Sequence, residues 1–584
     1  MAIPSKSYSP TAPKGPGVFS LLVPYKRLVL FMIIFALLGN GINLLLPKII
    51  ANAIDAYPAH YIVSQIITTY LIASLVIFIF TGLQNYVQVY ASEKVAKDLR
   101  TRLATKLSVQ SFAYIEECNP SKLLTNLTAD VDSIKMFVSQ AIVSIASSII
   151  IIIGACILLF SINWRLALAV VTIVPVIGGA FFFVLKKVRV IFIQSRQVID
   201  RLNKVINESI LGSAIIRVIN SQHLEYEKFL EANTRGMALG MSILKLFAAL
   251  IPIIIFTANL ASLSILTLGG RFVIGGSMTL GDFAAFSSYL SMLIFPILVI
   301  GFMSNVIAQA TASYSRISSV LNTPEIETQT SVNTALAGNI ELKNVSVLYG
   351  QKPALKHVSF VVKAGSSLAI IGPTGAGKTQ LLYLLTGLIK PGEGLLEFDG
   401  VNIDDYIKEN FYSQVGFVFQ DSILFNMSIR ENIAFNKKVN EVSLQKAIDT
   451  AELKDFIDHL PNHLDTIVSE RGSSLSGGQK QRIMLARALA INPKILLLDD
   501  FTARVDSSTE MKILNNLKKN YPDITLLSVT QKIDTAKWYD HIIVLMDGEI
   551  VATGIHNDLI KQNPEYIQIY NSQQSTSNYE LQSK

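Results

Sequence analysis

The chain has 584 residues, of which 51% are hydrophobic and 16% are charged, and its formal net charge is +7. Soluble globular chains carry roughly a quarter charged residues, so this composition argues against an ordinary soluble protein and favours a membrane protein. The basic residues gather just outside apolar runs, as in Lys26–Arg27, Lys94–Arg102 and Lys186–Arg189. This is the pattern of cytoplasmic membrane flanks, and it argues against a nucleic-acid partner.

Residues 1–17 are rich in Pro, Ser and Lys without an apolar core, and they predict a flexible N-terminus rather than a cleavable signal peptide. From 18 to 322 the sequence predicts an all-α membrane domain. The long connections at 91–135 and 186–245 are polar and basic, and they predict helical extensions on the cytoplasmic side together with both termini. Six apolar stretches approach the ~20 residues that a spanning helix needs. They lie at 28–50, 62–90, 137–161, 164–187, 244–268 and 282–306.

The second half of the chain has a different pattern. The polar stretch at 323–338 predicts a linker. From 339 to 571, short β-type runs alternate with helical runs, which predicts an α/β domain with a largely parallel sheet. The polar tail at 572–584 predicts disorder. The sequence thus predicts a multidomain membrane protein, with an all-α six-helix transmembrane domain followed by an α/β domain.

The clearest motif fits the pattern G-x-x-x-x-G-K-S/T between a β-type run and a helical run. Its glycines let backbone N–H groups cradle phosphate oxygens, and the helix N-terminus adds partial positive charge. We expect Lys378 to reach the outer phosphates of a nucleotide and the Thr379 hydroxyl to bind Mg²⁺. The motif consists of Gly372, Pro373, Thr374, Gly375, Ala376, Gly377, Lys378 and Thr379.

Two later motifs suggest where the rest of the site lies. The apolar run 495–498 ends in Asp499, as a buried parallel strand does when its last residue faces a metal, and Asp499 is expected to hold Mg²⁺ through water. A second helix N-terminus with small residues, able to approach a phosphate, precedes the helical run 481–490. One domain does not easily use two such sites on one nucleotide, which favours a nucleotide held by another domain. This second motif is Leu475, Ser476, Gly477, Gly478 and Gln479.

The phosphate loop, the LSGGQ motif and the Asp-ended strand, in that order, resemble the nucleotide-binding domain of the ABC transporter family. Six membrane helices ahead of one such domain resemble an exporter-type half-transporter. The resemblance implies a P-loop NTPase fold for 339–571, ATP and Mg²⁺ as cofactors, and ATP hydrolysis coupled to transport. It also implies a second ABC half-transporter as partner, in the lipid bilayer.

The resemblance implies further site residues at matching positions. Tyr349 matches the aromatic residue that stacks on adenine, and Gln420 matches the glutamine that contacts Mg²⁺ and senses the membrane domain. Glu470 matches a segment for cross-talk between domains, and Asp506 matches the loop that crosses the dimer interface. In the membrane half, the segments 119–132 and 207–219 fall where the family places its coupling helices.

Two positions depart from the family pattern. Asp500 stands where the family has the Glu that orients the attacking water, and Gln531 stands where it has a His that contacts the γ-phosphate. A carboxylate set back by ~1 Å costs on the order of 10²-fold in rate, and Gln cannot carry the charge of an imidazole. We therefore expect this chain to bind ATP, to hydrolyse it slowly, and to lend LSGGQ to a partner's site. This pattern resembles the weak-site subunit of a heterodimeric exporter, and a homodimer remains an alternative.

The predicted membrane helices contain few ionisable residues, which favours a small lipophilic or amphipathic substrate. Short loops and the lack of a targeting signal favour a bacterial inner membrane, with the N-terminus and the ATP-binding domain in the cytoplasm. An alternative, which Asp500 and Gln531 keep open, is a nucleotide-gated regulatory or channel-like subunit that does not pump by itself.

Overall fold

The computed structural model describes residues 17–56, 63–324, 332–349, 352–469, 472 and 474–582. The chain forms two compact units. The first unit comprises Met1–Val109 and Cys118–Pro324, and the second comprises Gln110–Glu117 and Glu325–Lys584. A short segment inside the first half of the sequence therefore belongs with the second unit, whereas the prediction placed all of 18–322 in the membrane domain. Of the predicted linker, 325–331 lies outside the described residues.

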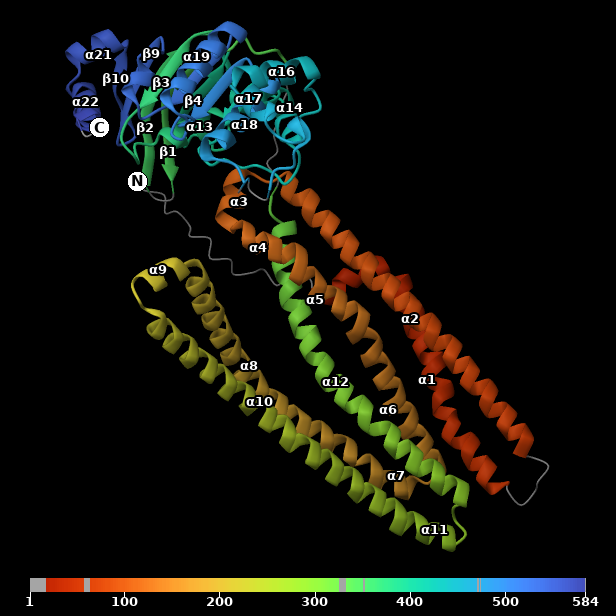
Figure 1. Cartoon of the computed structure of the whole chain (residues 1–584). Helices are drawn as coiled ribbons and strands as arrows, with labels where there is room; N and C mark the ends of the chain where they lie inside the picture. Colours follow the sequence, from red (N-terminus) through yellow and green to blue (C-terminus); the bar gives the residue numbers. More distant parts are fainter. Residues whose placement is uncertain are drawn as a thin grey trace, which may run out of the picture. The chain divides into compact units, whose positions relative to one another are not determined.

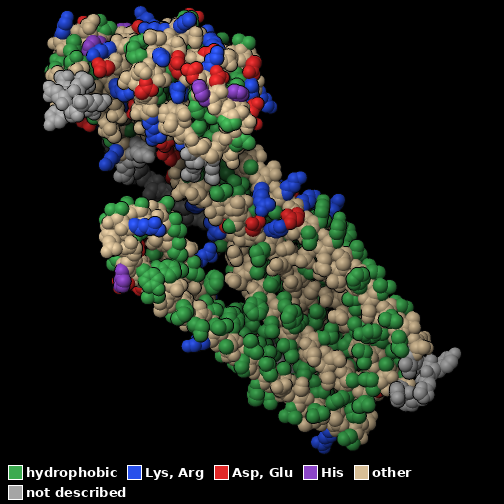
Figure 2. Space-filling model, in the orientation of Figure 1, with side chains coloured by type: hydrophobic (Ala, Val, Ile, Leu, Met, Phe, Trp, Pro, Cys, Tyr) green, Lys and Arg blue, Asp and Glu red, His purple; other side chains and the backbone are tan. Residues whose placement is uncertain are grey.

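Six helical segments of the described chain are long and apolar enough to cross a membrane, one for each predicted stretch. Each is longer than the ~20 residues that a span requires, which agrees with the predicted helical extensions. The segments are Val18–Asp55, Ser64–Ser108, Pro120–Ile162, Trp164–Leu211, Gln222–Ile274 and Leu280–Leu321. Figure 2 shows hydrophobic side chains over most of the visible surface of these helices, with charged side chains near the helix ends.

Within the first unit, α1, α2, α6 and α12 pack together, while α8 and α10 form a long hairpin with α9 at its tip (Figure 1). The α-helices of this unit are α1 (Lys26–Asp55), α2 (Val63–Ser108), α4 (Pro120–Thr125), α5 (Val131–Met136), α6 (Ile142–Ile162), α7 (Trp164–Val171), α8 (Ile173–Leu211), α9 (Ser213–Val218), α10 (Gln222–Ser264), α11 (Gly270–Ile274) and α12 (Leu280–Leu321). Short 3₁₀ and π segments join some of them. They are Val18–Tyr25, Asn126–Asp130, Phe137–Ala141 and Ile265–Gly269.

Polar contacts join α1 to α12 although the two helices are far apart in sequence. The fully buried Tyr289 donates a hydrogen bond from its hydroxyl to the carbonyl of Leu44 over 2.9 Å. Lys48 Nζ lies 2.6 Å from Asp282 Oδ1. A charge within an apolar region is tolerated when it is paired. The ion pair with Asp282 therefore accounts for the charge of Lys48 within an apolar helix.

The second unit contains two sheets. A four-stranded antiparallel sheet has the order β2-β1-β4-β5, and a six-stranded sheet has the order β10-β9-β3-β8-β7-β6. In the larger sheet only β10 is antiparallel to its neighbour. The strands are β1 (Ile340–Tyr349), β2 (Lys352–Val362), β3 (Ser367–Ile371), β4 (Glu393–Phe398), β5 (Val401–Asn402), β6 (Val415–Val418), β7 (Ile495–Asp499), β8 (Thr525–Val529), β9 (His541–Met546) and β10 (Glu549–Gly554).

The larger sheet is buried on both faces, which confirms the predicted α/β class. Leu496 and Leu498 of β7 join one apolar core, whereas Ile495 and Leu497 join the other. Strands covered on both faces read as continuous apolar runs, which is the pattern of 495–498. The α-helices of this unit are α3 (Phe112–Cys118), α13 (Lys378–Leu385), α14 (Lys408–Tyr412), α15 (Ile429–Ile433), α16 (Glu441–Thr450), α17 (Lys454–Asp458), α18 (Gly477–Ala490), α19 (Ser507–Asn520), α20 (Ile533–Ala536), α21 (His556–Gln562) and α22 (Pro564–Gln582). Short 3₁₀ turns lie at Ile403–Asp405 and His463–Asp465.

The end of the chain differs from the prediction of a disordered tail at 572–584. Helix α22 continues to Gln582. The polar composition of the last residues is what predicted disorder, but the helix starts earlier, where Tyr566 is fully buried.

Candidate functional site

Four parallel strands bring the predicted site residues to one edge of the larger sheet. The neighbours β3, β8, β7 and β6 are all parallel, so their carboxyl ends share that edge. The phosphate loop follows β3, Gln531 follows β8, Asp499 ends β7 and Gln420 follows β6. Ligands of open α/β sheets bind outside the carboxyl ends of the strands. The sheet thus brings together residues that are far apart in the sequence.

The phosphate loop, 372–377, curls around the side chain of Lys378. Lys378 is 8% exposed, and its ammonium group donates hydrogen bonds to the carbonyls of Gly372 over 2.7 Å and Pro373 over 2.8 Å. Gly375 and Gly377 have φ of +86° and +96°, a left-handed conformation in which a side chain is strained. Backbone N–H groups of a loop in this conformation can surround an anion.

Lys378 and two carboxylates form a buried charged group. Burial lowers the pKa of Lys378 from its ordinary value, and the negative charges of Asp500 and Asp499 oppose this effect. Asp499 and Asp500 are 1% and 8% exposed. Burial raises the pKa of Asp499 to about 6 and also raises the pKa of Asp500. A buried carboxylate is stabilised by a cation, so this group is suited to take one.

Asp499 fits the role of a metal ligand. A hydrogen bond from the Thr379 side chain lowers its pKa against the effect of burial. The second carboxylate oxygen, Asp499 Oδ2, is buried and has no hydrogen-bond partner among the described residues. A buried, unsatisfied oxygen is costly unless a ligand reaches it, and oxygen atoms are the ligands that Mg²⁺ prefers. Thr379 and Asp499 are therefore suitably placed to share a Mg²⁺ ion.

Gln420 is exposed at the same edge of the larger sheet. It follows β6, in which Val418 pairs with Leu498 of β7, next to Asp499. Its backbone carbonyl accepts a hydrogen bond from Gln481 over 3.3 Å, and Gln481 lies on α18. The side chain of Gln420 is thus on the correct edge of the sheet, while its backbone is tied to the helix that carries the LSGGQ motif.

The two departures from the family pattern are in contact. Gln531 Nε2 donates a hydrogen bond to Asp500 Oδ2 over 3.3 Å. Asp500 has φ of +47°, a conformation that is uncommon outside glycine and concentrates at functional sites. Its backbone N–H donates to the carbonyl of Val529 over 3.1 Å. Both chain segments are therefore fixed to one another, and the side-chain amide of Gln531 faces the carboxylate of Asp500.

The LSGGQ motif starts α18. The Ser476 hydroxyl accepts from the Gln479 N–H over 3.3 Å, and Gln479 Oε1 accepts from the Ser476 N–H over 2.8 Å, which is a capping box. Ser476 is exposed and Leu475 packs against the core. A methyl group added at Gly477 or Gly478 would come within 2.8 Å of Arg504. The glycines thus let the motif lie directly against the loop that follows β7.

That loop ends at Asp506, which caps α19. Its carboxylate accepts hydrogen bonds from the Thr509 N–H over 2.9 Å and from the Ser508 hydroxyl over 2.7 Å, and these bonds lower its pKa. Asp506 is exposed, as the predicted interface role requires. Glu470 lies outside the described residues. Tyr349 ends β1, and its side chain is likewise outside the described part.

The sequence prediction missed one contact in this unit. Gln110–Glu117 belongs to the second unit. Phe112 of α3 packs edge-on against Tyr383 of α13, with ring centroids 5.6 Å apart. Tyr383 in turn lies 6.2 Å from the rings of Phe417 and Phe419, just before Gln420. No local pattern in the sequence marks this contact, because Phe112 and Tyr383 lie in segments that are far apart in the chain.

Comparison with known proteins agrees with this arrangement. The family model described as ABC transporter transmembrane region matches residues 29–297, and the family model described as ABC transporter matches residues 355–503. A solved structure of a bacterial Atm1-family ABC exporter with ATP bound superposes with a TM-score of 0.77 at 25% identity, covering 94% of this chain and 98% of that chain.

Related proteins extend over nearly the whole chain. YfiB of Bacillus subtilis (strain 168), an ABC transporter ATP-binding protein, is 32% identical, covering 95% of this chain and 98% of the relative. An ATP-dependent lipid A-core flippase of Syntrophus aciditrophicus (strain SB) is 30% identical, with 86% and 85% covered. YheI of Bacillus subtilis, a probable multidrug resistance ABC transporter, is 29% identical, with 93% and 94% covered. With its membrane region, phosphate loop and LSGGQ helix, this multi-pass membrane chain belongs to the ABC transporter family.

Proposed function

We propose that this chain is one half of an ATP-driven exporter of a lipophilic or amphipathic substrate, and that its own ATP site hydrolyses slowly. It pairs with a second, different half-transporter and supplies LSGGQ to that partner's site. The observation that supports slow hydrolysis is the contact between Gln531 and Asp500. A homodimer, in which both sites would be slow, is the alternative arrangement.

ATP would be bound by the phosphate loop and Lys378, and Mg²⁺ by Thr379, Asp499 and Gln420. Mg²⁺ bound there would offset the negative charge of the outer phosphates. The unsatisfied oxygen of Asp499 and the buried ammonium of Lys378 support this assignment. Nothing in this set departs from the family pattern, so binding is expected to be intact.

Hydrolysis requires more than binding. A general base must lie within hydrogen-bond reach of the water that it activates. Asp500 is shorter than Glu by one methylene group, and its carboxylate is turned to the Gln531 amide. Gln531 donates a neutral hydrogen bond, so it cannot supply the positive charge that a protonated imidazole would bring. Slow hydrolysis follows from these two properties together.

A dimer would account for the exposed apolar surface at the tip of the α8–α10 hairpin. The tip of the α8–α10 hairpin is strongly apolar and exposed: Leu211 is 78% exposed, Ile215 65% and Val218 86%. Exposed apolar patches mark interaction sites. Helix α3 differs, because its Phe112 packs against Tyr383 within the second unit. We infer that α9 docks on the ATP-binding domain of the partner half.

The same pairing gives a transport cycle. Each nucleotide would lie between the phosphate loop of one chain and the LSGGQ helix of the other, so that ATP holds the two ATP-binding domains together. Their closure would move α3 and α9 and turn the membrane cavity outward. Hydrolysis at the partner's site would reopen the pair.

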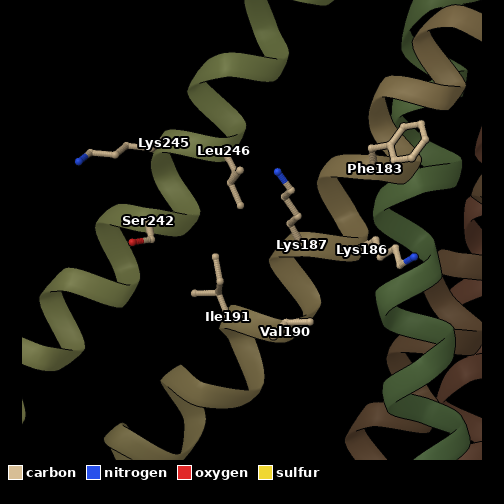
Figure 3. A pocket seen from close by; sticks show the side chains of 8 residues that line it. All are labelled: Phe183, Lys186, Lys187, Val190, Ile191, Ser242, Lys245 and Leu246. Carbon is tan, nitrogen blue, oxygen red and sulfur yellow. The ribbon is translucent and has the colours of Figure 1, made fainter.

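A cavity in the membrane unit is compatible with an amphipathic substrate. It has a volume of about 760 Å³ and opens between α8 and α10. Figure 3 shows Lys187 between the two helices with Ile191 and Leu246, whereas Lys186 and Lys245 point in different directions. Of the three lysines that line the cavity, Lys187 is the one that points between the helices, beside apolar side chains. The lining residues are Phe183, Lys186, Lys187, Val190, Ile191, Ser242, Lys245 and Leu246.

Inverted vesicles from bacteria that express the chain with a second half-transporter test the proposal. The protein is expected to lie in the inner membrane with its ATP-binding domain cytoplasmic, so ATP added outside should drive a lipophilic fluorescent dye into these vesicles. Vesicles with the chain alone should bind ATP without accumulating dye. ATP-dependent ion flux without dye accumulation would instead support a nucleotide-gated channel or regulatory subunit.

A further inference from the structure

The short loop between β8 and α20 carries Gln531, and the structure fixes its backbone from two sides. On one side is α19. The carboxylate of Glu510, 2% exposed, accepts from Lys532 Nζ over 2.9 Å and also from the Thr535 hydroxyl. Lys532 Nζ further donates to the carbonyl of Thr502 over 3.2 Å. These contacts hold the far end of the loop, and at its near end the Thr530 N–H donates to the carbonyl of Ile370 over 3.1 Å. The carbonyl of Gln531 between them is met from the other side.

On the other side is α22, through the side chain of Gln573. Its amide Nε2 donates to the carbonyl of Gln531 over 2.6 Å, and its Oε1 accepts from the N–H of Ile533 over 3.0 Å. Ile533 is the first residue of α20, and its N–H is one of the donors that a helix leaves without an internal partner. The residue before it, Lys532, provides no side-chain cap among the described contacts. Gln573 therefore caps α20 from another helix.

Helix α22 is itself firmly attached. Tyr566 is fully buried, and its hydroxyl lies 2.7 Å from His556 Nδ1. The Lys537 ammonium group lies 5.0 Å from the centroid of the Tyr570 ring, a favourable cation–π distance. These contacts fix the turn before Gln573 against α20 and α21, so the position of its amide follows from packing.

The contacts form a continuous path from the end of the chain to the nucleotide site. The Gln573 amide holds the backbone of Gln531, and the Gln531 side chain holds Asp500. A side chain can meet its partner over 3.3 Å only while its own backbone stays in place.

We propose that Gln573 is a positioning residue, by which α22 sets the place of Gln531 opposite the γ-phosphate of ATP. The family models match only as far as residue 503, so the family match does not supply this role. The effect of nucleotide rests on the proposed ATP site, but the cap on α20 does not. A purely structural cap would stabilise α20 without changing how the loop responds to nucleotide.

Hydrogen–deuterium exchange on the full-length chain in lipid nanodiscs tests this, with and without Mg²⁺ and the ATP analogue AMP-PNP. Gln573→Ala should raise exchange at the Ile533 amide by about tenfold, because that N–H loses its acceptor. It should also remove the protection that AMP-PNP gives to 530–533, while protection of the phosphate loop at 372–379 remains.

Gln573→Glu keeps the acceptor for Ile533 but loses the donor to Gln531. In the Gln573→Glu variant the Ile533 amide should therefore stay protected, whereas the protection that AMP-PNP gives to 530–533 should be lost.

Gln568→Ala is the matched control. Gln568 is on the same helix and exposed, and the described chain shows no hydrogen bond from its side chain. In this variant, exchange at the Ile533 amide and AMP-PNP protection of 530–533 should equal those of the unaltered chain. Unchanged exchange at Ile533 in Gln573→Ala, or full nucleotide protection of 530–533 in both Gln573 variants, would overturn the inference. If AMP-PNP does not protect 372–379 in the unaltered chain, the proposed ATP site is refuted. The exchange rate of the Ile533 amide then tests the cap on α20 independently.

Discussion

Gln531 Nε2 donates a hydrogen bond to Asp500 Oδ2 over 3.3 Å, so the two positions at which the chain departs from its family touch each other. Gln531 lies on the loop after β8 and Asp500 lies on the loop after β7, and the two side chains meet. A change at one of them therefore alters the environment of the other. This relationship gives a prediction about restoring hydrolysis.

The double variant Asp500→Glu, Gln531→His should raise ATP turnover of the purified chain by on the order of 10²-fold. The longer carboxylate would reach a water that Asp500 does not reach, and the imidazole would supply a charge at the γ-phosphate. Because the phosphate loop and LSGGQ are intact, two copies of the variant contain the other parts of a competent site. Phosphate release under saturating ATP measures the effect.

The control for this variant adds Lys378→Ala, which should abolish the gained turnover by removing the buried ammonium group of the phosphate loop. The gain of the double variant should differ from the product of the gains of the two single variants, because residues in contact are not independent. Turnover that stays at the original level in the double variant would show that the slow rate has another origin.

Gly478→Ala should impair the site that LSGGQ completes on another chain. The added methyl group would lie 2.8 Å from the carbonyl oxygen of Arg504, so the start of α18 must move. ATP binding to this chain should stay within about twofold, whereas turnover of the double variant above should fall at least about tenfold. Binding of a fluorescent ATP analogue and phosphate release measure the two effects.

Gly392→Ala is the glycine control, since an added methyl group there meets only an ordinary contact at 3.4 Å. Loss of ATP binding in Gly478→Ala, in parallel with turnover, would mean that the motif serves the nucleotide of its own chain and not that of a neighbour.

Phe112→Ala should weaken transport by loosening α3 from α13. Phe112 is the aromatic residue of α3 that meets Tyr383, and such a pair contributes ~1 kcal/mol, which corresponds to about fivefold. Dye accumulation with a partner half-transporter should fall by about that factor, while ATP binding does not change. Tyr86→Ala, at a residue of α2 that is 73% exposed, is the control and should leave both unaffected. Equal loss in the two variants would remove α3 from the coupling path.

Binding of Mg²⁺ with ATP should weaken as the pH falls through about 6. Burial raises the pKa of Asp499 to about 6 in the metal-free chain. The protonated carboxyl is a poor ligand, so the Mg²⁺-dependent part of ATP retention is present above this pH and lost below it. Retention with and without Mg²⁺ at a series of pH values measures this. In Asp499→Asn the Mg²⁺-dependent part should be small at every pH, and an unchanged pH profile in that variant would contradict the assignment.

Much of the site could be predicted from the sequence because its motifs are local. The phosphate loop needs only a strand, a glycine-rich turn and a helix, and all three follow one another between Ser367 and Leu385. Asp499 was identified because strand β7 is buried on both faces and therefore reads as an unbroken apolar run. The six membrane helices follow from length and hydropathy alone.

Contacts between distant segments could not be predicted in this way. No local pattern joins Phe112 to Tyr383, and the pairing of Gln531 with Asp500 depends on the order of strands in the sheet. The prediction of a disordered tail used only the composition of the last residues, whereas α22 begins before them, where Tyr566 is buried. Side-chain hydrogen bonds such as those of Gln573 are set by packing, which composition does not encode.

Single-turnover measurement on the purified chain without any partner tests the central claim most directly. The chain is incubated with Mg²⁺ and radiolabelled ATP, and the bound nucleotide is separated and identified over time. We expect ATP to be bound and to remain almost entirely ATP, with binding lost in Lys378→Ala. Rapid conversion of the bound nucleotide to ADP, also lost in Lys378→Ala, would contradict the account of a site that holds ATP but hydrolyses it slowly.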